Sequence, residues 1–226
     1  MKHRRGAPVP PRPFDPDCTR CARLAAYLAA CRRSNPGYHA RPVAAFGVRQ
    51  PGLLIVGLAP GFHGANRTGR PFTGDHAGLL LYATLHAHGF ANRSTATARG
   101  DGLKLIDCKI TNAVRCVPPG NRPLPREVQT CARYLAQDLA ERRAGGVVLA
   151  LGRVAHGAVL AALAIAPGKA PFAHGACHEL PGRFTLLDSY HCSRYNTQTG
   201  RLTAAMFDSV IAEAARRIRA STSSRS

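Results

Sequence analysis

The sequence predicts an α/β protein: a three-layer α/β/α sandwich around a central sheet of four parallel strands. Three observations predict it: four short apolar runs, helical periodicity between them, and 226 residues of which 45% are hydrophobic, which suits one domain with a sizeable core. Strands that alternate with helices favour a parallel sheet covered on both faces. Because ligands of such sheets bind beyond the carboxyl ends of the strands, the loops that follow them are the candidate sites.

Each element is placed by its own pattern. Short, largely apolar runs predict strands at residues 53–58, 105–114, 146–151 and 184–190. Apolar residues at spacings of three and four predict helices at residues 19–33, 77–88, 126–143, 154–164 and 203–219. We expect residues 1–14, rich in proline and arginine, to form a mobile basic arm, residues 15–219 a single domain, and the polar residues 220–226 a disordered tail.

The charge balance limits the class of partner. With 31 Lys and Arg against 12 Asp and Glu, the chain has a formal charge of +19, spread along its length. We expect an anionic polymer, with nucleic acid first; compositional drift or an anionic membrane are the alternatives. No apolar run reaches the roughly 18 residues of a membrane span, and the basic start lacks the apolar centre of a secretory signal. We therefore expect a cytoplasmic protein with reduced cysteines.

The loop after the first strand is rich in glycine and proline. It reads GLAPGFHGANRTGRPFTGD from Gly57 to Asp75, and it contains neither a Walker sequence nor a GxGxxG pattern. Its glycines allow backbone N–H groups to approach a planar or anionic ligand. Arg67 and Arg70 suit phosphates, whereas Phe72 is either a stacking platform or a core residue. Asp75, the only carboxylate, is either the N-cap of the next helix or a catalytic group.

A second polar loop, HCSRYNT, begins at His191 after the last strand. Its position at the carboxyl edge of the sheet, among Ser193, Arg194 and Asn196, favours a functional over a structural role for the histidine.

Four cysteines have the spacing of metal ligands. Cys18 and Cys21 are separated by two residues, and Cys116 and Cys131 by fourteen. Such a set suits zinc or an iron–sulfur cluster, and the residues alone favour zinc. The proline-rich segment 117–125 between them contains Asn121, whose amide either contacts a base edge or forms an Asx-turn.

The glycine-rich loop, with HCSRYNTQTG at residues 191–200, resembles the uracil-DNA glycosylase superfamily, and more narrowly its family-5 (type b) iron–sulfur branch, over about residues 18–207. The resemblance implies the superfamily fold and hydrolysis of the N-glycosidic bond of uracil in DNA, leaving an abasic site. It implies hypoxanthine and xanthine as further substrates, damaged DNA as partner, no membrane association, a monomer, and a nucleoid location in a prokaryote. The alternative is an iron–sulfur or zinc module that binds lesions without cleaving them.

The resemblance also implies roles for individual residues. Asp75 matches the carboxylate assigned to catalysis in family 5, which lacks the usual polar residue of the first motif, and His191 matches the histidine that contacts uracil O2. The implied base-binding residues are Gly57, Ala59, Pro60, Gly61, Phe62, Phe72 and Asn121. The implied DNA-binding residues are Arg67, Arg70, Arg122, Ser193, Arg194, Tyr195 and Asn196. The implied ligands of a structural [4Fe–4S] cluster are Cys18, Cys21, Cys116 and Cys131.

Overall fold

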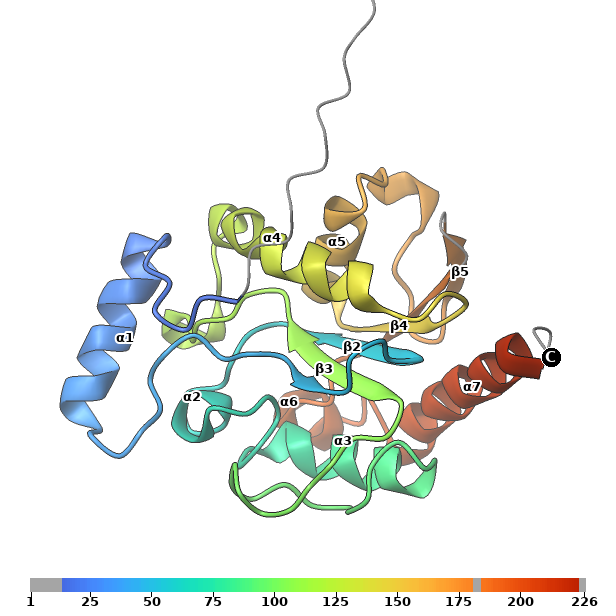
Figure 1. The fold of residues 1–226 in the computed structure, drawn as a ribbon, viewed down its shortest axis with the longest axis horizontal. Helices are drawn as coiled ribbons and strands as arrows, with labels where there is room; N and C mark the ends of the chain where they lie inside the picture. Colours follow the sequence, from blue (N-terminus) through green and yellow to red (C-terminus); the bar gives the residue numbers. More distant parts are fainter. Residues whose placement is uncertain (1–13, 181–183, 224–226) are drawn as a thin grey trace, which may run out of the picture.

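The structure is a computed structural model in which residues 14–180 and 184–223 are described. Helices α4 (Pro125–Glu141) and α5 (Arg153–Ala162) cover one face of a central sheet. Helices α3 (His76–Ala87) and α7 (Ala204–Ser223) cover the opposite face (Figure 1). The predicted three-layer α/β/α architecture is therefore confirmed.

The four predicted strands form the parallel part of the sheet. Their order in space is β3 (Cys108–Asn112), β2 (Leu53–Gly57), β4 (Val147–Leu151) and β6 (Phe184–Ser189). Every residue of these strands is buried. Because neighbouring strands are parallel, their carboxyl ends meet at one edge of the sheet.

The predicted number of strands is wrong, because the described residues form a sheet of six. Strand β1 (Phe46–Gly47) pairs antiparallel with β3, and β5 (Cys177–Leu180) pairs antiparallel with β6. The two additional strands lie at the edges of the sheet. They are short and only partly buried, so no continuous apolar run marks them in the sequence.

The sheet buries both of its faces. Leu53 and Ile55 of β2 belong to the core shared with α3 and α7, whereas Leu54 and Val56 belong to the core shared with α4 and α5. This alternation follows from the two-residue period of a strand. Because both faces are covered, the strand sequence is a continuous apolar run instead of an alternating one.

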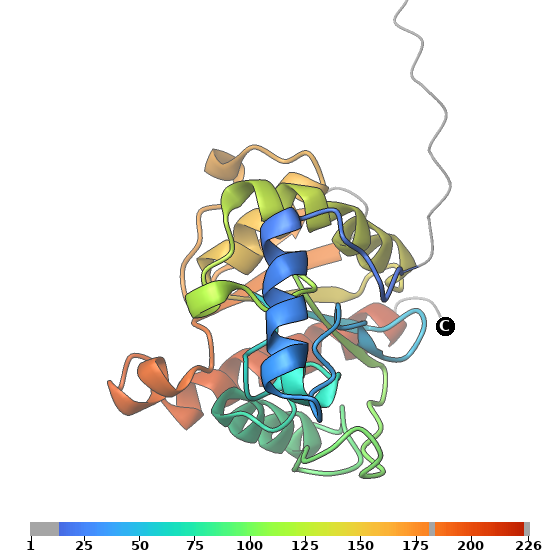
Figure 2. The same ribbon diagram turned by 90° about the vertical axis from the view of Figure 1, so that its left-hand side faces the viewer.

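Helix α1 (Ala22–Ser34) lies outside the two helical layers, at one end of the molecule (Figure 2). Its Leu24, Leu28 and Cys31 share a small core with Tyr134 of α4. The remaining helical segments are the short helices α2 (Ala65–Thr68) and α6 (Arg194–Gln198) and the 3-10 turns η1 (Pro119–Asn121) and η2 (Pro167–Lys169).

The ends of the domain differ from the expected limits. Phe14 packs edge-on against Tyr134 with 5.4 Å between ring centroids, so it is part of the folded domain; the rest of the expected arm lies outside the described residues. Helix α7 extends to Ser223, four residues into the segment expected to be a disordered tail.

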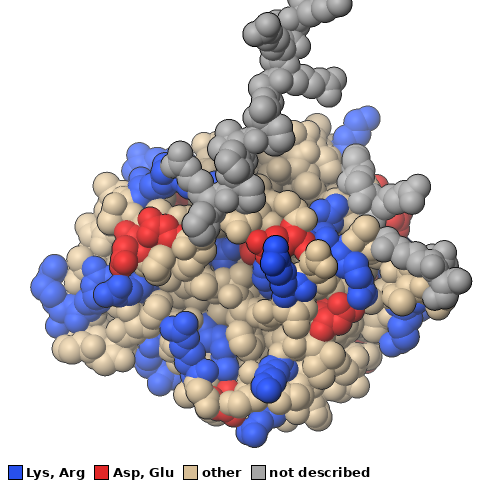
Figure 3. Space-filling model, in the orientation of Figure 1, with Lys and Arg blue, Asp and Glu red and all other residues tan. Residues whose placement is uncertain are grey.

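None of the helices in the described ranges is long and apolar enough to cross a membrane. Basic side chains are spread over the face shown in Figure 3, with acidic ones between them.

Candidate active site and cysteine corner

A cavity of about 460 Å³ opens where the parallel strands end. It draws residues from the loops after β2, β3, β4 and β6, as expected for ligand sites of such sheets. It is lined by Leu58, Ala59, Gly61, Ala65, Phe72, Asp75, His76, Ala77, Asn112, Asn121, Leu151, Gly152, Arg153, Val154, His191, Ser193 and Arg194.

Asp75 is the N-cap of α3 and also a wall of the cavity. Its Oδ1 accepts a hydrogen bond from the Gly78 backbone N–H at 3.0 Å. Its Oδ2 lies over Gly61 and Gly64, and a side chain at Gly64 would collide with it. Burial raises the pKa of the Asp75 carboxyl, whereas the N–H groups of Gly78 and Ala77 oppose this shift. One oxygen therefore caps the helix and leaves the other available, so the two roles considered from the sequence are compatible.

His191 lies in the cavity with its ring stacked on Phe72, at 5.8 Å between centroids and 27° between planes. Burial lowers the pKa of His191 to about 4, so its imidazole is neutral at neutral pH. The side chain of Asn196 donates to the His191 carbonyl oxygen at 2.8 Å. The amide of Asn196 therefore supports this loop from within, and its expected role as a DNA contact stays a prediction. Ser193 is the N-cap of α6 and also lines the cavity.

The expected base-binding residues divide into two groups. Ala59, Gly61, Phe72 and Asn121 line the cavity. Gly57, Pro60 and Phe62 are not among its lining residues. Phe62 instead packs on Tyr27 and Tyr38, with ring centroids 6.4 and 5.8 Å apart, so the described contacts give no support to its expected role in binding the base.

Gly57 shapes the cavity without lining it. A Cβ at this position would lie 2.7 Å from the Phe72 ring and would also collide with Asn112 Oδ1. Its lack of a side chain therefore allows these two groups to approach the end of β2. Phe72 itself has a φ of 52°, in the left-handed region, which is strained for a bulky residue.

Asn112 is a cavity residue that the sequence analysis missed. It ends β3, its side chain is 3% exposed, and its Oδ1 has no hydrogen-bond partner in the described structure. Leaving a buried acceptor without a partner costs about 1–3 kcal/mol. The feature of the sequence that could have identified Asn112 was a single amide side chain at the carboxyl end of a buried strand. The strand predicted at residues 105–114 ran past this position and concealed it.

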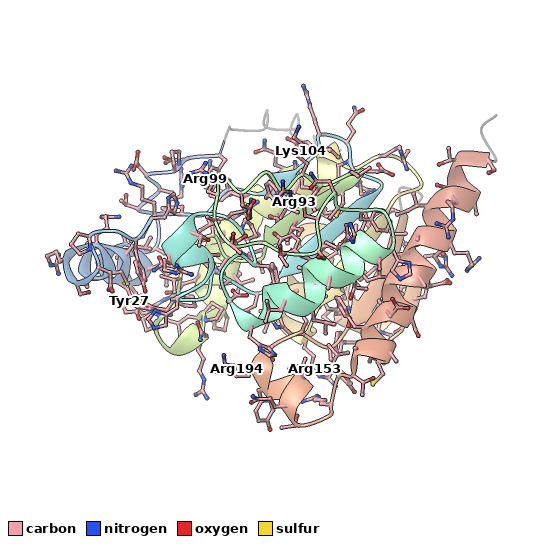
Figure 4. The ribbon with its side chains drawn as sticks, turned by 90° about the horizontal axis from the view of Figure 1, so that it is seen from below. Tyr27, Arg93, Arg99, Lys104, Arg153 and Arg194 are labelled. Carbon is pink, nitrogen blue, oxygen red and sulfur yellow. The ribbon has the colours of Figure 1, made fainter. Side chains whose placement is uncertain are left out.

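Two exposed arginines, Arg153 and Arg194, line the cavity and lie on the same side of the molecule (Figure 4). Arg153 was not predicted, although it follows a strand directly. Tyr195 is 70% exposed, and Arg67 and Arg122 are also exposed. Arg93, Arg99 and Lys104 lie on the opposite side of the molecule from the two cavity arginines (Figure 4).

The expectation that Arg70 faces DNA phosphates is wrong. Its side chain is 3% exposed and pairs with both carboxylate oxygens of Asp101, at 2.9 and 2.6 Å. Its guanidinium also lies over the Phe46 ring at 5.1 Å. Arg70 therefore fixes the loop that contains Asp101 to the domain, and its donors are used within the protein.

The four cysteines with metal-ligand spacing line a second, smaller hollow, which we call the cysteine corner. They are Cys18, Cys21, Cys116 and Cys131. None of them forms a disulfide. Burial raises the pKa of Cys116 to about 12 and that of Cys131 to about 11. The backbone N–H of Arg115 donates to Cys131 Sγ at 3.3 Å.

Four sulfur donors lining one hollow suit the chemistry of zinc or of an iron–sulfur cluster, both of which bind thiolates. Within residues 14–180 and 184–223, no three His, Cys, Asp or Glu side chains are close enough to hold a single metal ion.

Comparisons with known proteins agree with this geometry. Residues 44–215 match the model of the protein family described as the uracil DNA glycosylase superfamily. A type-5 uracil-DNA glycosylase of Thermus thermophilus is 47% identical over 204 residues, covering 88% of this chain and 93% of that protein. Proteins of the same name from Mycobacterium bovis (41% identical; 87% of this chain, 76% of that protein) and Pyrobaculum aerophilum (39%; 88% of each) are also similar. The chain therefore belongs to the uracil-DNA glycosylase superfamily, among relatives of type 5.

Proposed function

We propose that this chain excises uracil from DNA by hydrolysing the N-glycosidic bond and leaving an abasic site. The observation that carries the proposal is that Asp75 and His191, from loops 116 residues apart, line the same cavity at the ends of the strands. Superfamily membership supports the same reaction. The imidazole of His191 is neutral, as this hydrolysis requires, and although burial raises the pKa of Asp75, the N–H groups of Gly78 and Ala77 favour its carboxylate form.

The target nucleotide must leave the base stack before its sugar carbon becomes accessible. In the proposed complex, Phe72 forms an aromatic wall of the pocket for the extruded base. Asn112 and Asn121 supply amide groups to the base edge, and a bound base would provide the donor that Asn112 Oδ1 lacks. Arg153 and Arg194 at the rim bind the flanking phosphates, which orients the duplex without reading its sequence.

The chemistry separates charge between base and sugar. As the bond from C1′ to the base breaks, its electron pair leaves with the uracil, and neutral His191 donates a hydrogen bond to O2, where negative charge develops. Asp75 Oδ2 stabilises the positive charge on the sugar and accepts the proton of the water that attacks C1′. The cap bonds from Gly78 and Ala77 favour the ionised carboxylate that this role needs.

We also propose hypoxanthine and xanthine as substrates. The walls at Ala59 and Gly61 have no polar side chain, and contacts from backbone and aromatic groups tolerate different ring substituents. We further propose that the chain acts as a monomer in the nucleoid of a prokaryotic cytoplasm, since its substrate is chromosomal DNA and its charge of +19 favours attraction to DNA.

For the cysteine corner we propose a structural [4Fe–4S] cluster held by Cys18, Cys21, Cys116 and Cys131. Shared lining of one hollow supports a common ligand for these four sulfurs, and zinc is the alternative. Such a group would cross-link the start of α1 to the segment after β3 and to α4. Iron, sulfide and zinc analysis of anaerobically purified protein, with its visible absorbance, distinguishes the two.

The deciding experiment incubates the protein with a duplex containing one uracil and then cleaves abasic sites with alkali. We expect strand breaks at uracil that nearly vanish in Asp75→Ala. Uracil-dependent binding without strand breaks would favour the alternative, a lesion-binding module that does not cleave. Full activity in Asp75→Ala would refute the role of the carboxylate.

A further inference from the structure

The loop that places Asn121 at the lip of the cavity contains two consecutive residues in the left-handed region. Gly120 and Asn121 both have left-handed conformations, with φ values of 60° and 56°. Within the turn, the backbone N–H groups of Asn121 and Arg122 donate to Pro118 and Pro119 carbonyl oxygens at 3.1 and 3.2 Å. Asn121 and its neighbours are exposed, so packing contributes little to their order. An exposed loop of this kind keeps one conformation only where contacts with the rest of the domain hold it.

Those contacts come from Arg23 on α1, almost one hundred residues earlier in the chain. Its Nη2 donates to the Arg122 carbonyl oxygen at 3.2 Å, directly after the two left-handed residues. Its Nε and Nη2 also form a two-point pair with Glu127, at 2.8 and 2.7 Å. This planar, charge-assisted geometry is available to arginine and not to lysine.

Glu127 completes the attachment from the other side of the loop. Its carboxylate is almost fully buried, and Oε2 accepts a hydrogen bond from the Leu124 backbone N–H at 2.7 Å. The two members of one ion pair thus hold both ends of segment 122–124: Arg23 binds the Arg122 carbonyl oxygen, and Glu127 binds the Leu124 N–H. Since Arg23 lies two residues after Cys21, this pair connects the cysteine corner to the lip of the cavity.

We propose that Arg23 is a positioning residue that fixes the Asn121 loop for base recognition. It touches neither substrate nor reacting atoms; it acts through Arg122, Glu127 and then Asn121. The proposal rests on the proposed function in assuming that Asn121 contacts the extruded base. Loss of Arg23 leaves the catalytic pair intact and lets the lip of the cavity disorder, so it weakens productive base binding more than the chemical step.

The first test measures the loop itself in the full-length protein. Hydrogen–deuterium exchange of the amides in residues 118–124 should become faster in Arg23→Gln, with exchange in β2, β4 and β6 unchanged. Arg33→Gln is the matched control, because it removes the same charge from an exposed position on the same helix. Unchanged exchange in the loop of Arg23→Gln would overturn the proposal. This readout does not depend on activity, so it stands even if the wild-type protein releases no uracil.

The second test is a double-mutant cycle on a uracil-containing duplex. Arg23→Gln and Asn121→Ala should each lower kcat/KM about tenfold, mostly through KM, the size expected for one charge-assisted hydrogen bond. If Arg23 acts through Asn121, the double variant is no worse than Asn121→Ala alone. A hundredfold, multiplicative loss would overturn the proposal. Should Arg23→Gln fail to fold, Arg23→Lys keeps the charge and one donor, and the same cycle applies with smaller single effects.

Discussion

The segment at and after the end of β3 contributes residues to two hollows, which differ in volume and in the chemical groups that line them. Asn112, the last residue of the strand, lines the large cavity, whereas Cys116, four residues later, lines the cysteine corner. The cavity of about 460 Å³ contains a buried amide oxygen with no protein partner. The corner, of about 20 Å³, is lined by four thiols, those of Cys18 and Cys21 half-buried and those of Cys116 and Cys131 buried. The large cavity thus offers space and an acceptor for a ligand, whereas the corner offers sulfur donors.

Burial shifts the pKa values of titratable groups in both hollows, with different consequences for their charge. In the cavity it holds His191 neutral and raises the pKa of Asp75 against the pull of two backbone N–H groups. In the corner it raises the thiol pKa values of Cys116 and Cys131, which therefore stay protonated at neutral pH unless a cation binds. A substitution in the cavity should therefore change the rate with little change in stability. A substitution in the corner should change stability and leave the chemistry of the folded molecules intact.

The largest effect is expected for Asp75→Asn, which should lower single-turnover uracil release by about a thousandfold or more. The asparagine retains an oxygen that accepts from the Gly78 N–H, so the cap of α3 and the melting temperature should be preserved. Asp75→Ala should lose both the activity and about 1 kcal/mol of unfolding free energy. A large loss of stability in Asp75→Asn would contradict the separation of rate from stability.

Cys131→Ser should have the next largest effect, on stability. It removes one of four convergent sulfurs together with the acceptor of the Arg115 N–H, and we expect a loss of about 3 kcal/mol in the free energy of unfolding, measured with denaturant. Cys177→Ser, at an exposed position, is the control and should be neutral. Rates should be normalised to the folded fraction. If folded Cys131→Ser were as inactive as Asp75→Asn, the corner would have a direct part in the chemistry.

His191→Ala should lower the rate about a hundredfold, as expected for the loss of one hydrogen-bond donor to a developing anion. Stability should change in a pH-dependent way. The folded pKa of about 4 lies below that of an exposed histidine, about 6.5. As the pH falls between these values, the unfolded chain binds a proton that the folded chain does not.

The contribution of His191 to stability is therefore lost on acidification through this window, and His191→Ala should flatten that decline. Denaturant unfolding at several pH values measures it. An unchanged decline in the variant would show that His191 is not the neutral, desolvated group described above.

The sequence was sufficient to predict the features that depend on residues close together along the chain. Strands β2 and β4 are continuous apolar runs because both faces of the sheet are buried. The loops after β2 and β6 could be identified as a site because parallel strands end together. Edge strands β1 and β5 could not be predicted, since two to four half-buried residues give no pattern. Arg70 could not be assigned either. Its burial depends on Asp101, 31 residues away, and a single sequence does not indicate that pairing.

Asn112→Ala is expected to give the smallest effect and the sharpest comparison with the corner. Removing the amide abolishes a buried acceptor without a partner, and the space gained opens into an existing cavity, so stability should stay equal or rise by about 1 kcal/mol. The same change should lower kcat/KM for uracil about tenfold, because a contact to the base edge is lost. Asn121→Ala, exposed at the lip, is the matched control and should lose similar activity without gaining stability. A variant that is both less stable and fully active would mean that Asn112 supports the fold, and that the large cavity, like the corner, was shaped for structure.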